Sequence, residues 1–203
     1  MNTLLTLGNT GIPLTILEKS AYSQWLTKQS QCDQNWITQT NFNGEGLVLL
    51  PNVSTDNAGT LKQAVFVVTD ASHYFACGNL ITQLPFGQYK LEAAPEHQQA
   101  ICFAWLIGAY DYSPYKTNKK ERTLSSLAVT EQALIDNAIN YAEATALVRD
   151  LVNTPAADMM PKNIGESAQA LVETFGGELS QLIGDELLEH NYPTIHAVGR
   201  ASE

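Results

Sequence analysis

The sequence is poor in basic residues. Only 11 of its 203 residues are lysine or arginine, against 21 aspartates and glutamates, which gives a net charge of −10. The imbalance is concentrated in residues 131–203, which carry twelve acids and three bases, whereas residues 1–130 carry nine and eight. Such a surface repels phosphate, so we expect no nucleic acid partner.

Motifs for phosphate binding, nucleophilic catalysis and metal binding are also missing. There is no G-x-x-x-x-G-K-[ST] or G-x-G-x-x-G loop and no G-x-S-x-G turn. The histidines show neither H-x-H nor H-E-x-x-H spacing, and they are His73, His97, His190 and His196. The sequence therefore assigns no catalytic, cofactor-binding or metal-binding residue to this chain.

Cysteines and long apolar runs are scarce. The three cysteines, Cys32, Cys77 and Cys102, form no C-x-x-C pair and are odd in number, which is typical of reduced thiols that are used in packing. No stretch has the pattern of a signal peptide or the length of a membrane span. We expect a cytoplasmic protein without disulfides and without a membrane partner.

Apolar residues make up 44% of the chain and charged residues 16%, which is typical of a globular protein with a core. Short aliphatic runs alternate with longer amphipathic segments. This alternation predicts an α/β fold with a largely parallel or mixed sheet. The expected strands are 14–17, 46–50, 63–69, 88–92 and 124–129, and the expected helices are 20–29, 74–84, 96–112 and 131–153.

A second α/β segment is predicted after the long helix, which Pro155 ends. It would contain a helix from Pro161 to Phe175, closed by Gly176, and then two strands at 178–183 and 194–198 with a short helix between them. Two strands leave apolar faces uncovered. Residues 154–203 are therefore expected to be the opening of an incomplete domain.

Two polar or aromatic groupings have a structural explanation. Asp185 and Glu186 are adjacent, so on a helix they point in different directions and form a poor acid/base pair. Trp105 lies within an apolar run and has no basic neighbours, which favours core packing over a platform for stacking bases.

Two stretches resemble the leucyl aminopeptidase (cytosol aminopeptidase) family. Residues 105–116, WLIGAYDYSPYK, match a helix that finishes in a Gly-x-Tyr-x-aromatic pattern followed by Tyr-Lys. Residues 146–161, ALVRDLVNTPAADMMP, match the junction between the interdomain helix and the catalytic domain, with an R-D-L-x-N-T-P core. Their order and spacing along the chain also agree with the family.

The resemblance implies an amino-terminal macro-like α/β domain with a mixed sheet at 1–129 and an interdomain linking helix at 130–153. Residues 154–203 would be the first βα elements of an incomplete catalytic α/β domain. It further implies a homohexameric, dinuclear metallo-exopeptidase that releases amino-terminal residues from a peptide substrate. Two divalent ions, zinc, manganese or magnesium, would serve as its cofactors.

The family's metal-binding blocks, G-K-G-x-x-F-D-S-G-G and N-T-D-A-E-G-R, do not occur in this sequence. No catalytic residue can therefore be carried over, and we expect this chain alone to bind no metal, to be inactive and to supply domain and oligomer contacts. An alternative is a non-enzymatic macro-like ligand-binding module, against which the missing glycine-rich loop counts. In a third interpretation, the uncovered faces of 154–203 dock onto another polypeptide.

Overall fold

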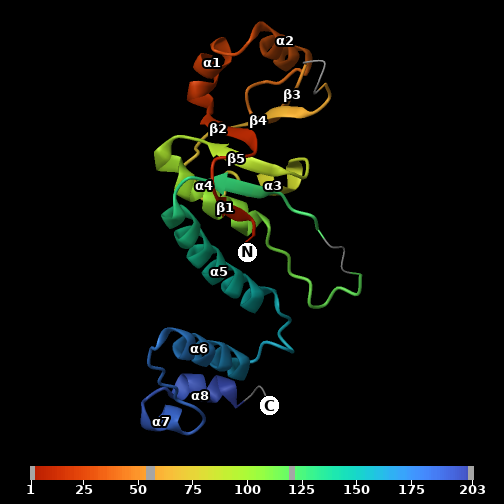
Figure 1. Ribbon diagram of the computed structural model, residues 1–203. Coiled ribbons are helices and arrows are strands. Elements are labelled where there is room, and N and C mark those ends of the chain that lie inside the picture. The colour runs from red at the N-terminus through yellow and green to blue at the C-terminus, as the bar shows by residue number, and fades with distance from the viewer. Residues whose placement is uncertain (1–2, 54–57, 119–121, 201–203) are drawn as a thin grey trace. The chain divides into compact units, whose positions relative to one another are not determined.

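A computed structural model describes residues 3–53, 58–118 and 122–200. The chain divides into two compact units, Met1–Arg149 and Asp150–Glu203, called here the first and the second unit (Figure 1). The division falls near the end of the longest helix, α5 (Gln132–Asn153). The three domain ranges expected from the sequence stay predictions.

The first unit is built on a six-stranded mixed sheet with the order β1-β6-β5-β2-β4-β3. All neighbouring strands are parallel except β3, which is antiparallel to β4. The α/β class with a mixed sheet is thus confirmed. The strands are β1 (Leu5–Leu7), β2 (Ile12–Glu18), β3 (Gly46–Pro51), β4 (Leu61–Val68), β5 (Gln88–Glu92) and β6 (Ser126–Val129).

Strand β4 is apolar along its second half because it is covered on both faces. Successive side chains of a strand point to opposite faces. Ala64, Phe66 and Val68 belong to one core cluster, together with residues of helices α4 (Pro95–Gly108) and α5. Val65 and Val67 belong to the other cluster, together with residues of α1 (Lys19–Thr27) and α2 (Gln31–Gln39). The first unit is therefore a three-layer α/β domain.

Several local features of the first unit differ from those predicted. The expected helix at 74–84 is a series of turns that ends in the four-residue helix α3 (Leu80–Gln83). The helix expected at 20–29 begins one residue earlier, at Lys19, directly after β2, and ends at Thr27. Strand β1 and helix α2 were not expected, since β1 has three residues and α2 buries only Asp33 and Ile37.

In the second unit, the predicted helix is confirmed as α6 (Pro161–Phe175). Pro161 occupies its first turn, and Gly176 ends it in the left-handed conformation at φ 69°. Both predicted strands are wrong: 178–183 has no regular structure, and 194–198 lies in helix α8 (Pro193–Gly199), after the short α7 (Glu186–Glu189). Pro193 presets the backbone for a helix, and the described residues 150–200 contain no strand for pairing.

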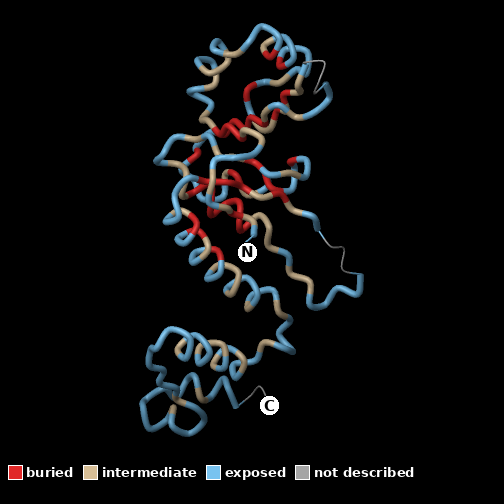
Figure 2. The backbone as a smooth tube through the Cα atoms, in the orientation of Figure 1, coloured by how far each residue is buried: buried red, intermediate tan, exposed pale blue. Residues whose placement is uncertain are grey.

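Burial differs sharply between the units (Figure 2). Among the described residues, every buried apolar one lies in the first unit, and none of 150–200 is buried. Among the described helices, none has the length and apolar character that crossing a membrane requires.

Candidate functional site

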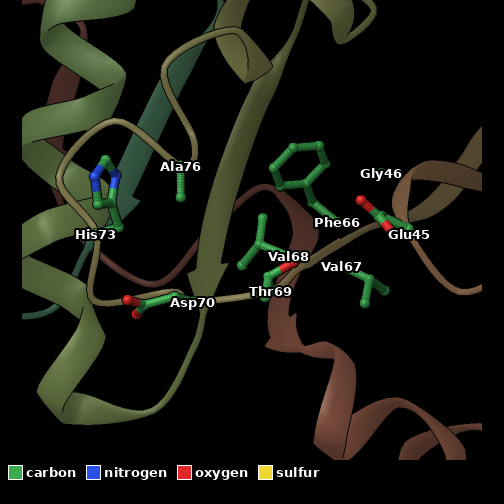
Figure 3. A pocket seen from close by; sticks show the side chains of 9 residues that line it. All are labelled: Glu45, Gly46, Phe66, Val67, Val68, Thr69, Asp70, His73 and Ala76. Atoms are coloured by element: carbon green, nitrogen blue, oxygen red, sulfur yellow. The ribbon is translucent and has the colours of Figure 1, made fainter.

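A cavity of about 370 Å³ lies at the carboxyl end of strand β4. In open α/β sheets, ligands bind beyond the carboxyl ends of the strands, so this position is where a site is expected. Figure 3 shows Asp70 and His73 on one side of the strand end and Glu45 on the other. The lining residues are Glu45, Gly46, Phe66, Val67, Val68, Thr69, Asp70, His73 and Ala76.

The polar groups of this cavity are bonded to neighbouring residues. Asp70 Oδ1 accepts hydrogen bonds from the hydroxyl and the amide of Ser72, at 2.5 and 2.8 Å, and these bonds lower the pKa of Asp70. Glu45 pairs with Lys19 at 3.0 Å. Because the Ser72 hydroxyl donates to a carboxylate and not to an imidazole base, the group is not a serine nucleophile with its base.

Glu18, the last residue of β2, links the ends of three neighbouring segments. Its Oε1 accepts a hydrogen bond from the amide of Ala71 at 3.2 Å and lies 3.7 Å from Nε2 of His97. His97 stands in the first turn of α4, and its Nδ1 is buried with no hydrogen-bond partner among the described residues. The carboxylate thus ties the segment after β4 to the end of β2.

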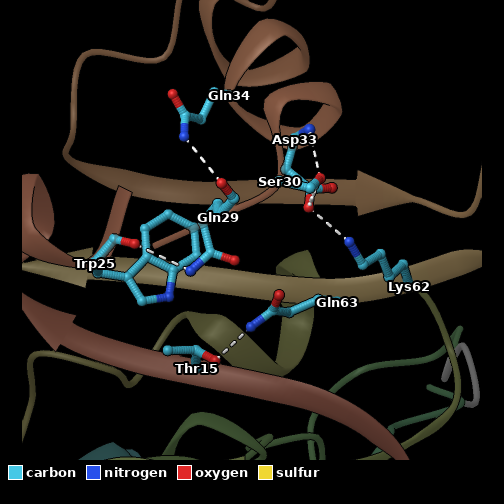
Figure 4. Close-up of polar contacts among 8 residues, drawn as sticks. All are labelled: Thr15, Trp25, Gln29, Ser30, Asp33, Gln34, Lys62 and Gln63. Carbon is cyan, nitrogen blue, oxygen red and sulfur yellow. Dashed lines mark hydrogen bonds and ion pairs between the residues drawn. The ribbon is translucent and has the colours of Figure 1, made fainter. Parts of the chain in front are cut away.

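A second polar cluster connects helix α2 to the sheet (Figure 4). Oδ2 of Asp33 accepts from Lys62 Nζ and from the Ser30 hydroxyl, both at 2.6 Å, and Ser30 Oγ caps the helix by accepting from the Asp33 amide. On β2 and β4, Gln63 donates to the hydroxyl of Thr15 at 2.7 Å. These contacts hold α2 against β4, and Asp33 also lines a second cavity of about 220 Å³, together with residues of α2 and the end of β3.

The four histidines do not converge on one site. His73 lies in a turn, His97 in α4, His190 at the end of α7, and His196 in α8, where Nε2 lies 3.1 Å from Asp185. Placing His196 in a strand was therefore wrong. Within 3–53, 58–118 and 122–200, no three histidine, cysteine or acidic side chains come together as a metal site. The described residues do not fit a dinuclear metal centre.

Neither buried cysteine is an activated nucleophile. Burial raises the pKa of the Cys77 and Cys102 thiols to about 12, so both stay protonated at neutral pH. Cys102 lies within α4 as expected, whereas Cys77 lies in the turn before α3 and not in a helix. Cys32 is exposed on α2.

The two stretches that resemble the aminopeptidases touch each other. Arg149 Nη1 donates to the carbonyl oxygen of Ile107 at 3.2 Å, and its guanidinium carbon lies 3.9 Å from the centre of the Tyr110 ring. Sequence reasoning missed this contact because it joins residues about 40 positions apart. The only sequence signals for this contact were a basic residue late in the long helix and a tyrosine after the end of α4.

Comparison with known proteins gives consistent results. Residues 12–129 match the family model described as "M17 aminopeptidase, N-terminal domain". A "Probable cytosol aminopeptidase" of Wolinella succinogenes is 28% identical over 178 residues, which covers 71% of this chain and 36% of the relative. "Peptidase B" of Cronobacter sakazakii is 35% identical over 94 residues, which covers 44% of this chain and 21% of the relative. The chain thus spans little more than a third of the length of the Wolinella relative.

Solved structures share the fold. A cytosol aminopeptidase from Coxiella burnetii aligns with a TM-score of 0.75 at 23% identity, covering 91% of this chain and 40% of that one. Leucyl aminopeptidase from Trypanosoma brucei, in complex with bestatin, aligns with a TM-score of 0.58 at 17% identity, covering 95% and 42%. The bottromycin maturation enzyme BotP in complex with Mn gives 0.56 at 19% identity, covering 81% and 36%.

These findings favour the aminopeptidase family over a non-enzymatic macro-like module. The family model covers more than half of the chain and the whole sheet except β1. The chain belongs to the M17 aminopeptidase family, and residues 12–129 are its N-terminal domain.

Proposed function

We propose that this chain is the N-terminal portion of a metal-dependent leucyl aminopeptidase that releases amino-terminal residues from peptides. The match of residues 12–129 to the M17 N-terminal domain carries this proposal. The names of the relatives support it, since they include cytosol aminopeptidases and a leucyl aminopeptidase. BotP, which was solved with Mn, supports a divalent cation as the cofactor.

In this proposal, the portion described here supplies contacts between domains and between subunits, and the chemistry takes place elsewhere. Because the described residues hold no set of three metal-ligating side chains, we assign them no step that passes through a metal. The cavity beside Asp70 is likewise given no catalytic role, because its carboxylates already pair with Ser72 and Lys19.

We further propose a cytoplasmic homo-oligomer, a hexamer by the family resemblance. The word cytosol in the names of the relatives supports the location. The many exposed apolar side chains of the second unit, such as Ile164, Phe175 and Ile195, support association, because apolar side chains gain free energy when another surface covers them.

Activity measurements on two purified proteins test the proposal. The 203-residue chain should not hydrolyse L-leucine amide, with or without added Mn²⁺. The protein translated from the complete reading frame around this sequence should hydrolyse it, and should lose activity in EDTA. Metal-dependent hydrolysis by the 203-residue chain would contradict its non-catalytic role, and an inactive complete protein would contradict the aminopeptidase. Sedimentation velocity of the complete protein tests the hexamer.

A further inference from the structure

Helix α4 ends at a point where a positive charge is favourable. It contains eight consecutive buried residues, Ala100–Ile107, and no basic residue in its last turn. The carbonyl oxygens of the last turn of a helix have no partner within the helix and carry negative partial charge. The Ile107 oxygen accepts one hydrogen bond from the amide of Tyr110, at 3.3 Å. It keeps a second lone pair for another donor.

Arg149 of helix α5 supplies both the donor and the charge. Its Nη1 donates to the Ile107 oxygen at 3.2 Å. Its guanidinium carbon lies 3.9 Å from the centre of the Tyr110 ring, well within the range of a cation–π contact. A planar guanidinium can donate in its plane and stack through its face at the same time, which an ammonium group cannot do.

This contact lies beyond the fully buried part of α5. The buried residues of α5 are Ile135, Ala138 and Ala142, all in its first half. Val148 is 58% exposed. Arg149 lies seven residues beyond Ala142, or about 10 Å farther along the helix, and it is the last residue of the first unit.

We propose that Arg149 is a positioning residue that clasps the second half of α5 to the end of α4 through Ile107 and Tyr110. The two stretches that carry the family resemblance, 105–116 and 146–161, meet at this Arg149 clasp. Without it, the first half of α5 stays packed on the core through its buried residues, while the second half frays. The clasp requires no catalytic activity, so an experiment that rules out the clasp does not contradict the proposed function.

Hydrogen exchange of the 203-residue chain, read by mass spectrometry, tests the clasp. Arg149→Ala and Tyr110→Leu should each raise exchange of the amides in 143–153 roughly tenfold, as expected for the loss of a hydrogen bond and a cation–π contact. Exchange in 132–142 should not change. Tyr110→Phe keeps the ring and should raise exchange less than Tyr110→Leu does, whereas Arg149→Lys keeps the charge without the planar face and should be intermediate.

The double variant Arg149→Ala/Tyr110→Leu distinguishes one shared contact from two independent contributions to the stability of α5. Its exchange in 143–153 should be no faster than that of the more affected single variant, because both substitutions remove the same contact. Lys162→Ala, which removes an equal charge from an exposed pair with Glu166 on α6, is the matched control and should leave 143–153 unchanged. Additive effects, a uniform rise across the first unit, or unchanged exchange in 143–153 would each overturn the proposal.

Discussion

At the residue scale, the structure gives physical reasons for two positions of the Gly-x-Tyr-x-aromatic pattern. The ring of Tyr110 makes a cation–π contact with the guanidinium of Arg149. Gly108, the last residue of α4, lies against the backbone of Gly78 in the turns after β4, and a Cβ atom at this position would overlap the Gly78 carbonyl oxygen. The glycine is therefore needed for close approach of two backbones and not for an unusual backbone angle.

Gly108→Ala should destabilise the first unit. Because the overlapping atom belongs to backbone and not to a flexible side chain, either the helix end or the turns must shift, which costs about 1–3 kcal/mol in a packed region. Urea unfolding measures the loss. Gly199→Ala, at the last residue of α8 with no atom within 4 Å of the new Cβ, is the control and should be neutral. Equal stability of the two variants would mean that α4 and the turns are not in close contact.

Asp33 is a buried carboxylate whose charge is compensated. Its side chain is only 8% exposed. Burial by itself raises the pKa of Asp33, but the hydrogen bonds from Lys62 and Ser30, together with the charge of Lys62, outweigh it and hold the pKa below its usual value of 3.8. A carboxyl whose pKa is lower in the folded state stabilises the fold above its unfolded pKa, and this contribution disappears as the pH falls through the folded pKa.

Asp33→Asn should therefore lower the free energy of unfolding at pH 7 by about 1.5–3 kcal/mol, the range for hydrogen bonds to a charged group. The difference from the wild type should shrink as the pH falls below 3.8. Urea unfolding across pH 2.5–7 gives both curves. Glu45→Gln, in an exposed pair with Lys19, should cost less than about 1 kcal/mol. A pH-independent difference for Asp33→Asn would show that the pair with Lys62 is not formed.

At the scale of elements, α5 combines a packed first half with a more exposed second half. Ala138 is 0% exposed, whereas Ala144, six residues later, is exposed. The same substitution at these two positions therefore tests how the helix lies. Ala138→Leu should cost about 1–3 kcal/mol through overpacking. Ala144→Leu should stay within about 0.5 kcal/mol, because Leu and Ala have similar helix propensities and the site is exposed. Similar losses in urea unfolding would contradict the packing of α5.

The elements that could be predicted are those whose buried residues form a recognisable apolar pattern in the sequence. β3 and β4 show compact apolar runs, α4 is a long apolar segment, and α5 combines length with apolar residues at helical spacing. Helix α2 was missed because it is held by polar contacts, the Ser30 cap and the Asp33 pair with Lys62, which leave no apolar period. A short apolar run such as 194–198 fits a strand or a helix equally well, and its periodicity does not distinguish the two.

The candidate site was less predictable than the fold because its contacts join distant parts of the chain. Glu18 meets His97 across 79 positions, and Arg149 meets Ile107 across 42. Neither pair has a sequence spacing that could reveal it. The resemblance to the aminopeptidases marked residues 105–116 and 146–161, but it did not show that they touch.

At the scale of the whole molecule, the two units differ in how much of their apolar surface is buried. The first unit has two buried core clusters. In the second unit, residues such as Ile164, Phe175 and Ile183 are 52%, 80% and 70% exposed, and no described residue of 150–200 is buried. Exposed apolar groups that gather in one region are typical of interaction surfaces, whereas single ones are common on any protein.

This difference predicts that the second unit supplies most of the dye-accessible apolar surface. The double variant Phe175→Gln/Ile183→Gln should bind less 8-anilinonaphthalene-1-sulfonate than the wild type and should scatter less light at high protein concentration, because both substitutions remove wetted apolar area. Val53→Gln removes one smaller apolar side chain, 69% exposed, from the first unit and should lower both measurements much less. If the double variant bound as much dye as the wild type, these side chains would have to be covered in solution by another part of the protein.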